Sequence, residues 1–170
     1  DRATMAHSLE ARVPYLDHRF VDWALTMPRH MKLRGKVGKY ALRKAIAKKL
    51  LEDNQIDVDP MGGVVVTPGG KQSLFEATLA FVEPGVDVLI PEPAWVSYVP
   101  MVELAGGRAG PVALDPDDNW RITPEALQAA VTPASRILFL NSPSNPTGRV
   151  LDAAELQAIA DFANEHDLLI

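Results

Sequence analysis

The sequence predicts an α/β fold, a mostly parallel sheet with flanking helices, preceded by a mainly helical segment. Beyond about residue 60, short apolar runs typical of buried strands alternate with segments of helical periodicity. This alternation is typical of parallel sheets covered by helices. The first 50 residues instead place their apolar side chains at helical spacing. A chain of 170 residues is long enough for one domain of ordinary size or two small ones.

The composition is that of a globular protein, with 47% hydrophobic and 23% charged residues, and it excludes a disordered chain. The chain has no cysteine, which excludes disulfides, thiolate zinc sites and cysteine nucleophiles. We expect no metal site. No apolar run approaches the roughly 20 residues that a membrane helix needs. We therefore expect no membrane partner and a cytoplasmic location.

Charge is divided unevenly along the chain, although the net charge is only −5. Residues 1–50 contain 12 Lys and Arg against 4 Asp and Glu, whereas residues 51–170 contain 5 against 18. A basic segment of this kind is one sign of nucleic-acid binding, but it is more often a solvated surface. Because aromatic residues are not interleaved with the basic ones, we expect no nucleic-acid partner.

The N-terminal segment contains two predicted helices. Asp17 is a suitable N-cap for a helix over 17–27, which Pro28 ends. A second helix is predicted over 39–51. Its expected apolar face consists of Leu42, Ala45, Ile46 and Leu50.

The alternation of strands and helices begins with the β-branched run 64–66, which predicts a strand. A glycine pair then opens a helix that continues to Phe81. A second strand is predicted over 86–90. The helix over 95–104 that follows it ends at a further glycine pair, at 106–107.

Two later helices have clear start signals. Thr123 is a good cap, with Pro124 at the first helical position. Asp152 and Glu155 have the spacing of a capping box, with Asp in place of Ser or Thr. The remaining predicted elements are strands over 111–114 and 136–140 and a last strand from Leu168.

Three loops at the carboxyl ends of predicted strands carry groups suited to a ligand. The glycine turn at 69–72 starts a helix, whose amides and dipole attract phosphate. Trp95 offers a ring for stacking, and Asn145 offers an amide that can bond a ligand oxygen. Each has an ordinary alternative: a glycine turn, a packed aromatic residue, or an Asn-Pro turn.

The stretches VVVTPGGKQSLFEA, VLIPEPAWVSYVPMVELAGG and ILFLNSPSNPTG occur in this order. Over residues from about 42 to 170 the chain resembles the large domain of fold-type I, class I/II aminotransferases close to aspartate aminotransferase, which use pyridoxal 5'-phosphate. The resemblance implies amino-group transfer between an amino acid and a 2-oxo acid, in a homodimer. It implies that Gly70, Lys71 and Gln72 hold the cofactor phosphate, Trp95 stacks on the pyridine ring, and Asn145 bonds its phenolic oxygen.

The same resemblance places the Schiff-base lysine and the acid that faces the pyridine nitrogen beyond Ile170. Lys71 is the last lysine of the sequence, and it lies in the expected phosphate turn. We therefore expect these 170 residues to be inactive in transamination and to bind the cofactor weakly and non-covalently at most, with no catalytic residue among them.

Residues from 1 to about 43 resemble another family, the synthetase domain of glutamine-dependent asparagine synthetases, through SLEARVPYLDHRFVDWA and the later Lys39-x-x-Leu-Arg pattern. This resemblance implies an ATP-dependent amide ligase, with ATP and Mg as the alternative cofactors. It implies that Lys39 faces the phosphates and that Glu10 and Arg12 belong to the wall of the ATP site. The SGGxDS pyrophosphate motif of that family does not occur here.

Together the two resemblances predict a chimeric and truncated chain. The predicted domains are an asparagine-synthetase-like helical fragment, 1–43, and a partial aminotransferase large domain, 44–170. Residues 42–47, Leu-Arg-Lys-Ala-Ile-Ala, fit both families. The sequence at 32–35 replaces an aromatic-rich stretch of aminotransferases, which puts the family homodimer in doubt. A third interpretation is a chimera without function.

Overall fold

The computed structural model describes residues 26–34 and 37–170. The chain divides into two compact units, 1–68 and 69–170. In the first unit a short helix, α3 (Arg29–Lys32), precedes strands β1 (Leu33–Arg34) and β2 (Val37–Gly38), which pair antiparallel. No helix or strand is predicted from the sequence between residues 28 and 38, so α3 and the strand pair are additions. The helix predicted over 17–27 falls almost wholly outside the described residues.

The second predicted helix is confirmed as α4 (Tyr40–Asn54), which begins one residue later and ends three residues later than expected. Its predicted apolar face is wrong in part, because Leu42 is 45% exposed whereas Ala47 is buried. Arg43 explains the difference: its Nη1 atom donates to the carbonyl oxygens of Met61 (3.4 Å) and Val64. These bonds turn the side of α4 that carries Arg43 and Ala47 toward residues 61–64.

The strand predicted over 64–66 is not present. Val64 is buried, but Val65 is 75% exposed and the run has no strand partner in the described part of the chain. The carbonyl groups bond side chains of the α4 region instead, with Lys39 Nζ donating to Val66 O over 3.3 Å. β-branched residues favour a strand only where a neighbour completes the hydrogen-bond ladder.

The second unit alternates strands and helices, as the sequence predicts, and its three strands form a parallel sheet in the order β4-β3-β5. The sheet brings the carboxyl ends of all three strands to one edge. The elements are α5 (Gly70–Phe81), β3 (Asp87–Glu92), α6 (Tyr98–Leu104), β4 (Arg108–Ala113), α7 (Pro124–Ala130), β5 (Ser135–Leu138) and α8 (Ala153–Glu165).

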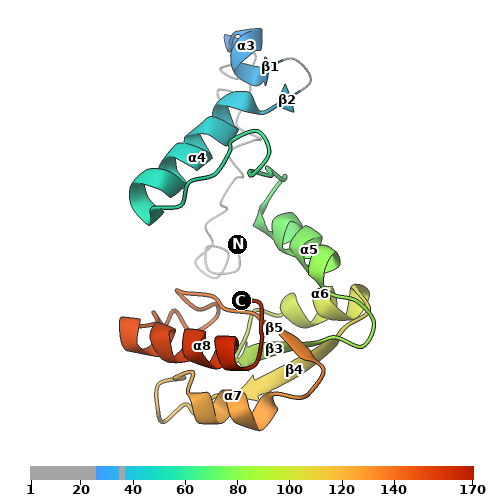
Figure 1. Ribbon diagram of the computed structural model, residues 1–170, viewed down its shortest axis with the longest axis vertical. Helices are drawn as coiled ribbons and strands as arrows, with labels where there is room; N and C mark the ends of the chain where they lie inside the picture. Colours follow the sequence, from blue (N-terminus) through green and yellow to red (C-terminus); the bar gives the residue numbers. More distant parts are fainter. Residues whose placement is uncertain (1–25, 35–36) are drawn as a thin grey trace, which may run out of the picture. The chain divides into compact units, whose positions relative to one another are not determined.

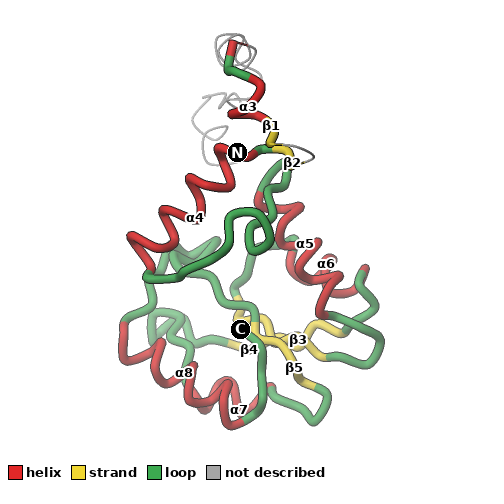
Figure 2. The backbone as a smooth tube through the Cα atoms, turned by 45° about the horizontal axis from the view of Figure 1, so that its top comes forward, coloured by secondary structure: helices red, strands yellow, loops and turns green. Residues whose placement is uncertain are grey.

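Helices cover both faces of this sheet (Figure 1). Successive side chains of β3 point to opposite faces. Leu89 packs in a cluster with residues of α7 and α8, whereas Val88 and Ile90 pack in a second cluster with Val102 of α6. Figure 2 shows the strands side by side, with α7 and α8 next to them. Burial on both faces explains why the central strand, β3, contains a continuous apolar run from Val88 to Ile90.

Helix starts in this unit follow the predicted signals closely. Thr123 Oγ1 accepts from the amide of Ala126 (3.2 Å), and Asp152 Oδ1 accepts from the amide of Glu155 (2.8 Å). The last predicted strand is reduced to a bridge between Leu169 and Ile137. Across the described residues, no helix has both the length and the apolar character needed to cross a membrane.

Candidate functional site: a ligand site at the carboxyl edge of the sheet

The start of α5 presents an open turn. The amides of Gln72 and Ser73 donate to Gly69 O over 3.1 and 3.2 Å. The amides of Gly70 and Lys71 lie in the first turn, where an α-helix provides no intrahelical acceptor, and the helix dipole makes this end attractive to anions. A Cβ atom added at Gly69 or Gly70 would meet nothing within 4 Å. A phosphate group could therefore approach the backbone closely here.

The structure brings this turn and the tryptophan together. Lys71 Nζ lies 5.0 Å from the centroid of the Trp95 ring, within the range of a cation–π contact. The predicted helix 95–104 begins only at Tyr98, so Trp95 lies in the loop after β3. Trp95 is half-buried, and its indole remains partly accessible.

Tyr98 connects Trp95 with the end of β5. Its ring meets Trp95 edge-on at 5.5 Å and 87°, and it meets Phe139 at 5.5 Å and 76°. Burial raises the pKa of the Tyr98 phenol, so the group is protonated at neutral pH and can donate a hydrogen bond. These ring contacts fix the Trp95 loop against the sheet.

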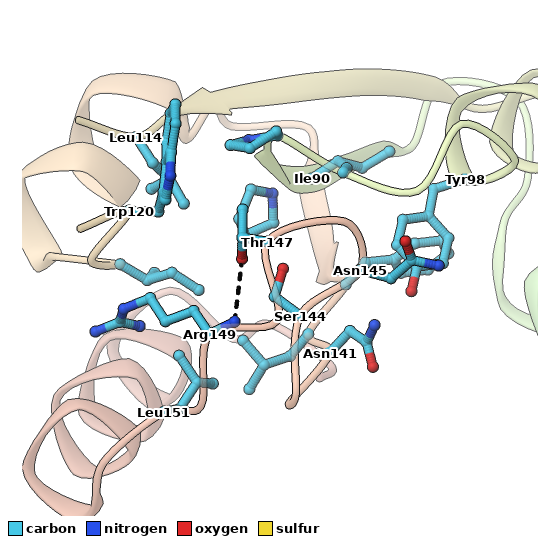
Figure 3. A pocket seen from close by; sticks show the side chains of 16 residues that line it. Ile90, Tyr98, Leu114, Trp120, Asn141, Ser144, Asn145, Thr147, Arg149 and Leu151 are labelled. Atoms are coloured by element: carbon cyan, nitrogen blue, oxygen red, sulfur yellow. Dashed lines mark hydrogen bonds between the residues drawn. The ribbon is translucent and has the colours of Figure 1, made fainter. Parts of the chain in front are cut away.

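Asn145 is exposed and lies on the wall of a pocket at the same edge of the sheet. Figure 3 shows Asn145 and Tyr98 on one side of this pocket, with Trp120 and Arg149 on the opposite side. The hydroxyls of Ser144 and Thr147 also line it. The pocket therefore combines aromatic walls with neutral polar groups, as small-molecule sites commonly do.

The loop that carries Asn145 is closed by its own hydrogen bonds. The Ser144 amide donates to Arg149 O over 2.8 Å, and the Gly148 amide donates to Ser144 O over 2.7 Å. Gly148 has φ of 75°, a left-handed conformation that glycine adopts without steric cost. The amide of Leu151 donates to Ser142 Oγ over 3.1 Å. Asn145 thus sits in a tight turn rather than in an open loop.

A buried ion pair adjoins this turn. Arg149 donates from Nη1 and Nη2 to the two carboxylate oxygens of Glu155, over 2.7 and 2.5 Å. The Glu155 side chain is fully buried and that of Arg149 is 13% exposed. Burial by itself raises the pKa of Glu155, but the hydrogen bonds from Arg149 and the Ile122 amide outweigh it, and the pKa lies below its ordinary value.

This pair corrects one expectation. In a capping box the Glu side chain returns to the backbone at the helix start. Here the Asp152 half is present, but Glu155 turns inward to Arg149 and to the amide of Ile122, 2.8 Å away. The charged partner available in the preceding loop and the buried amide explain the different orientation.

A second ion pair lies at the opposite, amino end of β3. Asp87 accepts from Arg108 Nε over 2.7 Å and from Thr132 Oγ1 over 2.6 Å. The hydrogen bond from Arg108 holds the pKa of Asp87 below its ordinary value, against the opposing effect of burial. Its distance along the strand from Trp95 and Asn145 makes this pair a structural one.

The structure describes only one residue of the alternative ATP site, Lys39. Glu10 and Arg12 lie outside the described residues, and Lys39 Nζ bonds the Val66 carbonyl. Within residues 26–34 and 37–170, no group of three or more His, Cys, Asp or Glu side chains could hold a metal ion.

The sequence reasoning missed Tyr98, Arg149 and Glu155 as parts of the site. Tyr98 lies three residues after Trp95, inside what was expected to be a continuous helix, so nothing in the sequence marked it as a link to β5. The sequence does single out Glu155, through its capping-box spacing from Asp152. Its partner Arg149 cannot be predicted in the same way, because that contact depends on how the 141–151 loop folds back.

The fold and this edge of the sheet define a class of protein, and comparison with known proteins identifies it. The family described as aminotransferase class I and II matches residues 22–170. The chain belongs to this family. The match includes part of the segment 1–43 that we compared with asparagine synthetases.

Individual members of this family are similar to the chain in sequence. The chain is 41% identical over 133 residues to an aspartate aminotransferase of Musicola paradisiaca, covering 78% of this chain and 33% of the relative. It is 42% identical over 134 residues to aromatic-amino-acid aminotransferase 2 of Thermococcus litoralis, covering 79% and 34%. The chain therefore spans about a third of the length of these relatives.

A solved structure supports the fold directly. The aromatic aminotransferase of Pyrococcus horikoshii superimposes with a TM-score of 0.75 at 41% identity, over 88% of this chain and 39% of that one. The family implies pyridoxal phosphate as its cofactor.

Proposed function

We propose that these 170 residues form the phosphate-holding and ring-stacking part of a pyridoxal-phosphate site that serves amino-group transfer from an amino acid to a 2-oxo acid. The observation that carries the proposal is the contact between Lys71, at the open helix start, and Trp95, in the loop after β3. A phosphate-binding turn and a stacking ring thus lie next to each other, as a phosphorylated pyridine requires.

The residues present fit this cofactor. Gly70 and Lys71 offer backbone amides and a helix dipole to its phosphate, Gln72 closes the same turn by donating its amide to Gly69 O, and open space surrounds the glycines. Trp95 offers a partly accessible indole to the ring. Asn145 offers an amide to a ring oxygen from the pocket wall. When bound, pyridoxal phosphate supplies an electron sink for the amino acid's α-carbon.

We propose that the 170-residue polypeptide, tested alone, binds the cofactor without a covalent bond and does not transaminate. Its last lysine is Lys71, whose amine is held against the Trp95 ring in the expected phosphate turn. A lysine in that place supports the phosphate end of the cofactor rather than its aldehyde. The carbonyl chemistry of the family needs a lysine at the aldehyde.

Titration with pyridoxal phosphate tests the proposal. We expect saturable quenching of tryptophan fluorescence, lost when inorganic phosphate competes, and no lysine joined to the cofactor after borohydride reduction and peptide mass spectrometry. Lys71→Met is the matched control, because it removes the amine of the turn and leaves the two glycines unchanged. Saturable binding that is insensitive to phosphate would contradict the assignment of the turn, and a reducible adduct at Lys71 would contradict non-covalent binding.

The asparagine-synthetase resemblance of residues 1–43 remains a hypothesis. We expect no exchange of pyrophosphate into ATP in the presence of aspartate, since the SGGxDS motif is not among these residues and Lys39 bonds Val66 O. Measurable exchange would favour an ATP-dependent ligase.

A further inference from the structure

We propose that Glu155 is a positioning residue that holds the Asn145 turn in place through Arg149. The inference rests on the proposed function, because it concerns how Asn145 is presented to the cofactor. Its physical basis is a buried network that joins three segments of the second unit: the loop after β5, the first turn of α8, and the strand-to-helix connection before α7.

The network converges on one carboxylate. Glu155 receives two hydrogen bonds from Arg149 (2.7 and 2.5 Å) and one from the amide of Ile122 (2.8 Å), which is 33 residues away in sequence. The Glu155 side chain has no exposed surface. A bidentate guanidinium–carboxylate pair has a fixed geometry, and water does not screen it here.

Arg149 transmits this anchor to the turn. Its backbone carbonyl accepts from the Ser144 amide (2.8 Å), and its amide donates to Thr147 Oγ1 (3.3 Å), the bond drawn in Figure 3. Asn145 lies between these closing bonds. The side chain of Arg149 is therefore attached to the interior while its backbone closes the turn that carries Asn145.

Asn145 itself is exposed, and its side chain makes no hydrogen bond to the described part of the chain. Its amide direction therefore depends on the backbone that supports it. Ser144 and Thr147, which line the same pocket, are held by the same bonds. Loss of the Glu155 anchor would loosen all three polar groups together.

The first test uses hydrogen exchange and does not require the cofactor. In Glu155→Gln we expect the amides of Ser144 and Gly148 to exchange about tenfold faster, as expected when a charge-assisted pair is weakened. Asp87→Asn is the matched control, because it removes another buried, arginine-bonded acid, which lies at the amino end of β3 and away from the Asn145 turn. Equal acceleration in both variants, or none in Glu155→Gln, would overturn the proposal.

The second test is a double-mutant cycle on pyridoxal-phosphate affinity. We expect Glu155→Gln to raise Kd about fivefold when Asn145 is intact and to have no further effect in Asn145→Ala, because coupled residues are not additive. A purely structural role would give the same factor in both backgrounds, and that result would overturn the proposal.

A second variant and a cofactor-independent measurement cover the cases in which the first tests fail. If Glu155→Gln does not fold, Arg149→Met with Glu155→Met removes the pair without leaving a buried charge, and the same faster exchange is expected. If the parent chain binds no pyridoxal phosphate, the proposed function fails, while hydrogen exchange still decides whether Glu155 holds the turn.

Discussion

The ammonium group of Lys71 lies 5.0 Å from the centre of the Trp95 ring, so a helix start and a strand end that are 24 residues apart meet at one place. Taken singly, a lysine in a glycine turn and a tryptophan in a loop do not indicate a ligand site. Their contact gives the glycine turn and the loop after β3 a common role, and it underlies the proposed cofactor site.

Removing the Trp95 ring should weaken cofactor binding. In Trp95→Ala we expect Kd for pyridoxal phosphate to rise about two- to tenfold, since aromatic stacking contributes about 0.5–1.5 kcal/mol. Trp95→Phe should recover most of the affinity. Isothermal titration calorimetry measures both, with Val96→Ala as control because that neighbour is 71% exposed. Equal affinity in Trp95→Ala and the parent would exclude stacking on this ring.

Two glycine substitutions should separate binding from folding. Gly70→Ala should leave the melting temperature unchanged or slightly higher, because open space surrounds the new Cβ and alanine favours helix. It should nevertheless raise the cofactor Kd, because glycine permits the closest approach of a ligand to the backbone.

Gly107→Ala is the opposite case and serves as its comparison. A Cβ atom there would lie 2.4 Å from Val82 Cγ1 and 3.1 Å from Val86 O, and overpacking of this kind costs about 1–3 kcal/mol. We expect a lower melting temperature by calorimetry. If Gly70→Ala destabilises as much as Gly107→Ala, the turn is structural and the phosphate assignment is wrong.

Acid should destabilise the second unit. Asp87 and Glu155 have ordinary pKa values of 3.8 and 4.5, and both are lowered in the folded protein. The unfolded chain therefore binds protons at higher pH than the folded one. The stability that these acids contribute is complete above the ordinary pKa and is lost as pH falls through about 4.5 toward the lowered values.

Urea unfolding at a series of pH values measures this effect. Glu155→Gln and Asp87→Asn should each flatten the dependence of the unfolding free energy on pH below about 4.5. Asp161→Asn is a suitable control, because Asp161 is an exposed acid on α8 that accepts a hydrogen bond from the neutral side chain of Gln157. A slope unchanged by both test variants would show that other groups take up the protons.

An apolar groove should bind a hydrophobic dye. The groove is lined by Phe81 of α5 and by Leu169 and Ile170. These side chains are 61%, 47% and 54% exposed, respectively. We expect enhanced fluorescence of anilinonaphthalene sulfonate at neutral pH. Phe81→Lys should reduce the signal without lowering the melting temperature, because the ring is mostly exposed already. An undiminished signal would place the dye elsewhere.

The agreement between sequence and structure is closest where local chemistry decides. Thr123 and Asp152 each cap a helix with the side chain that the pattern indicates. Residues 64–66 show the opposite. A β-branched run fits a strand, yet a strand also needs a neighbour, and Lys39 and Arg43 bond those carbonyls instead.

By itself the sequence determined the α/β class, the order of strands and helices after residue 69, and the three loops that carry Gly70, Trp95 and Asn145. Periodicity and caps are local properties and can be read along the chain. Only the tertiary structure decided that Lys71 meets Trp95, that Tyr98 joins Trp95 to Phe139, and that Glu155 faces Arg149. Such contacts depend on which strands become neighbours, and the packing of the whole sheet sets that arrangement.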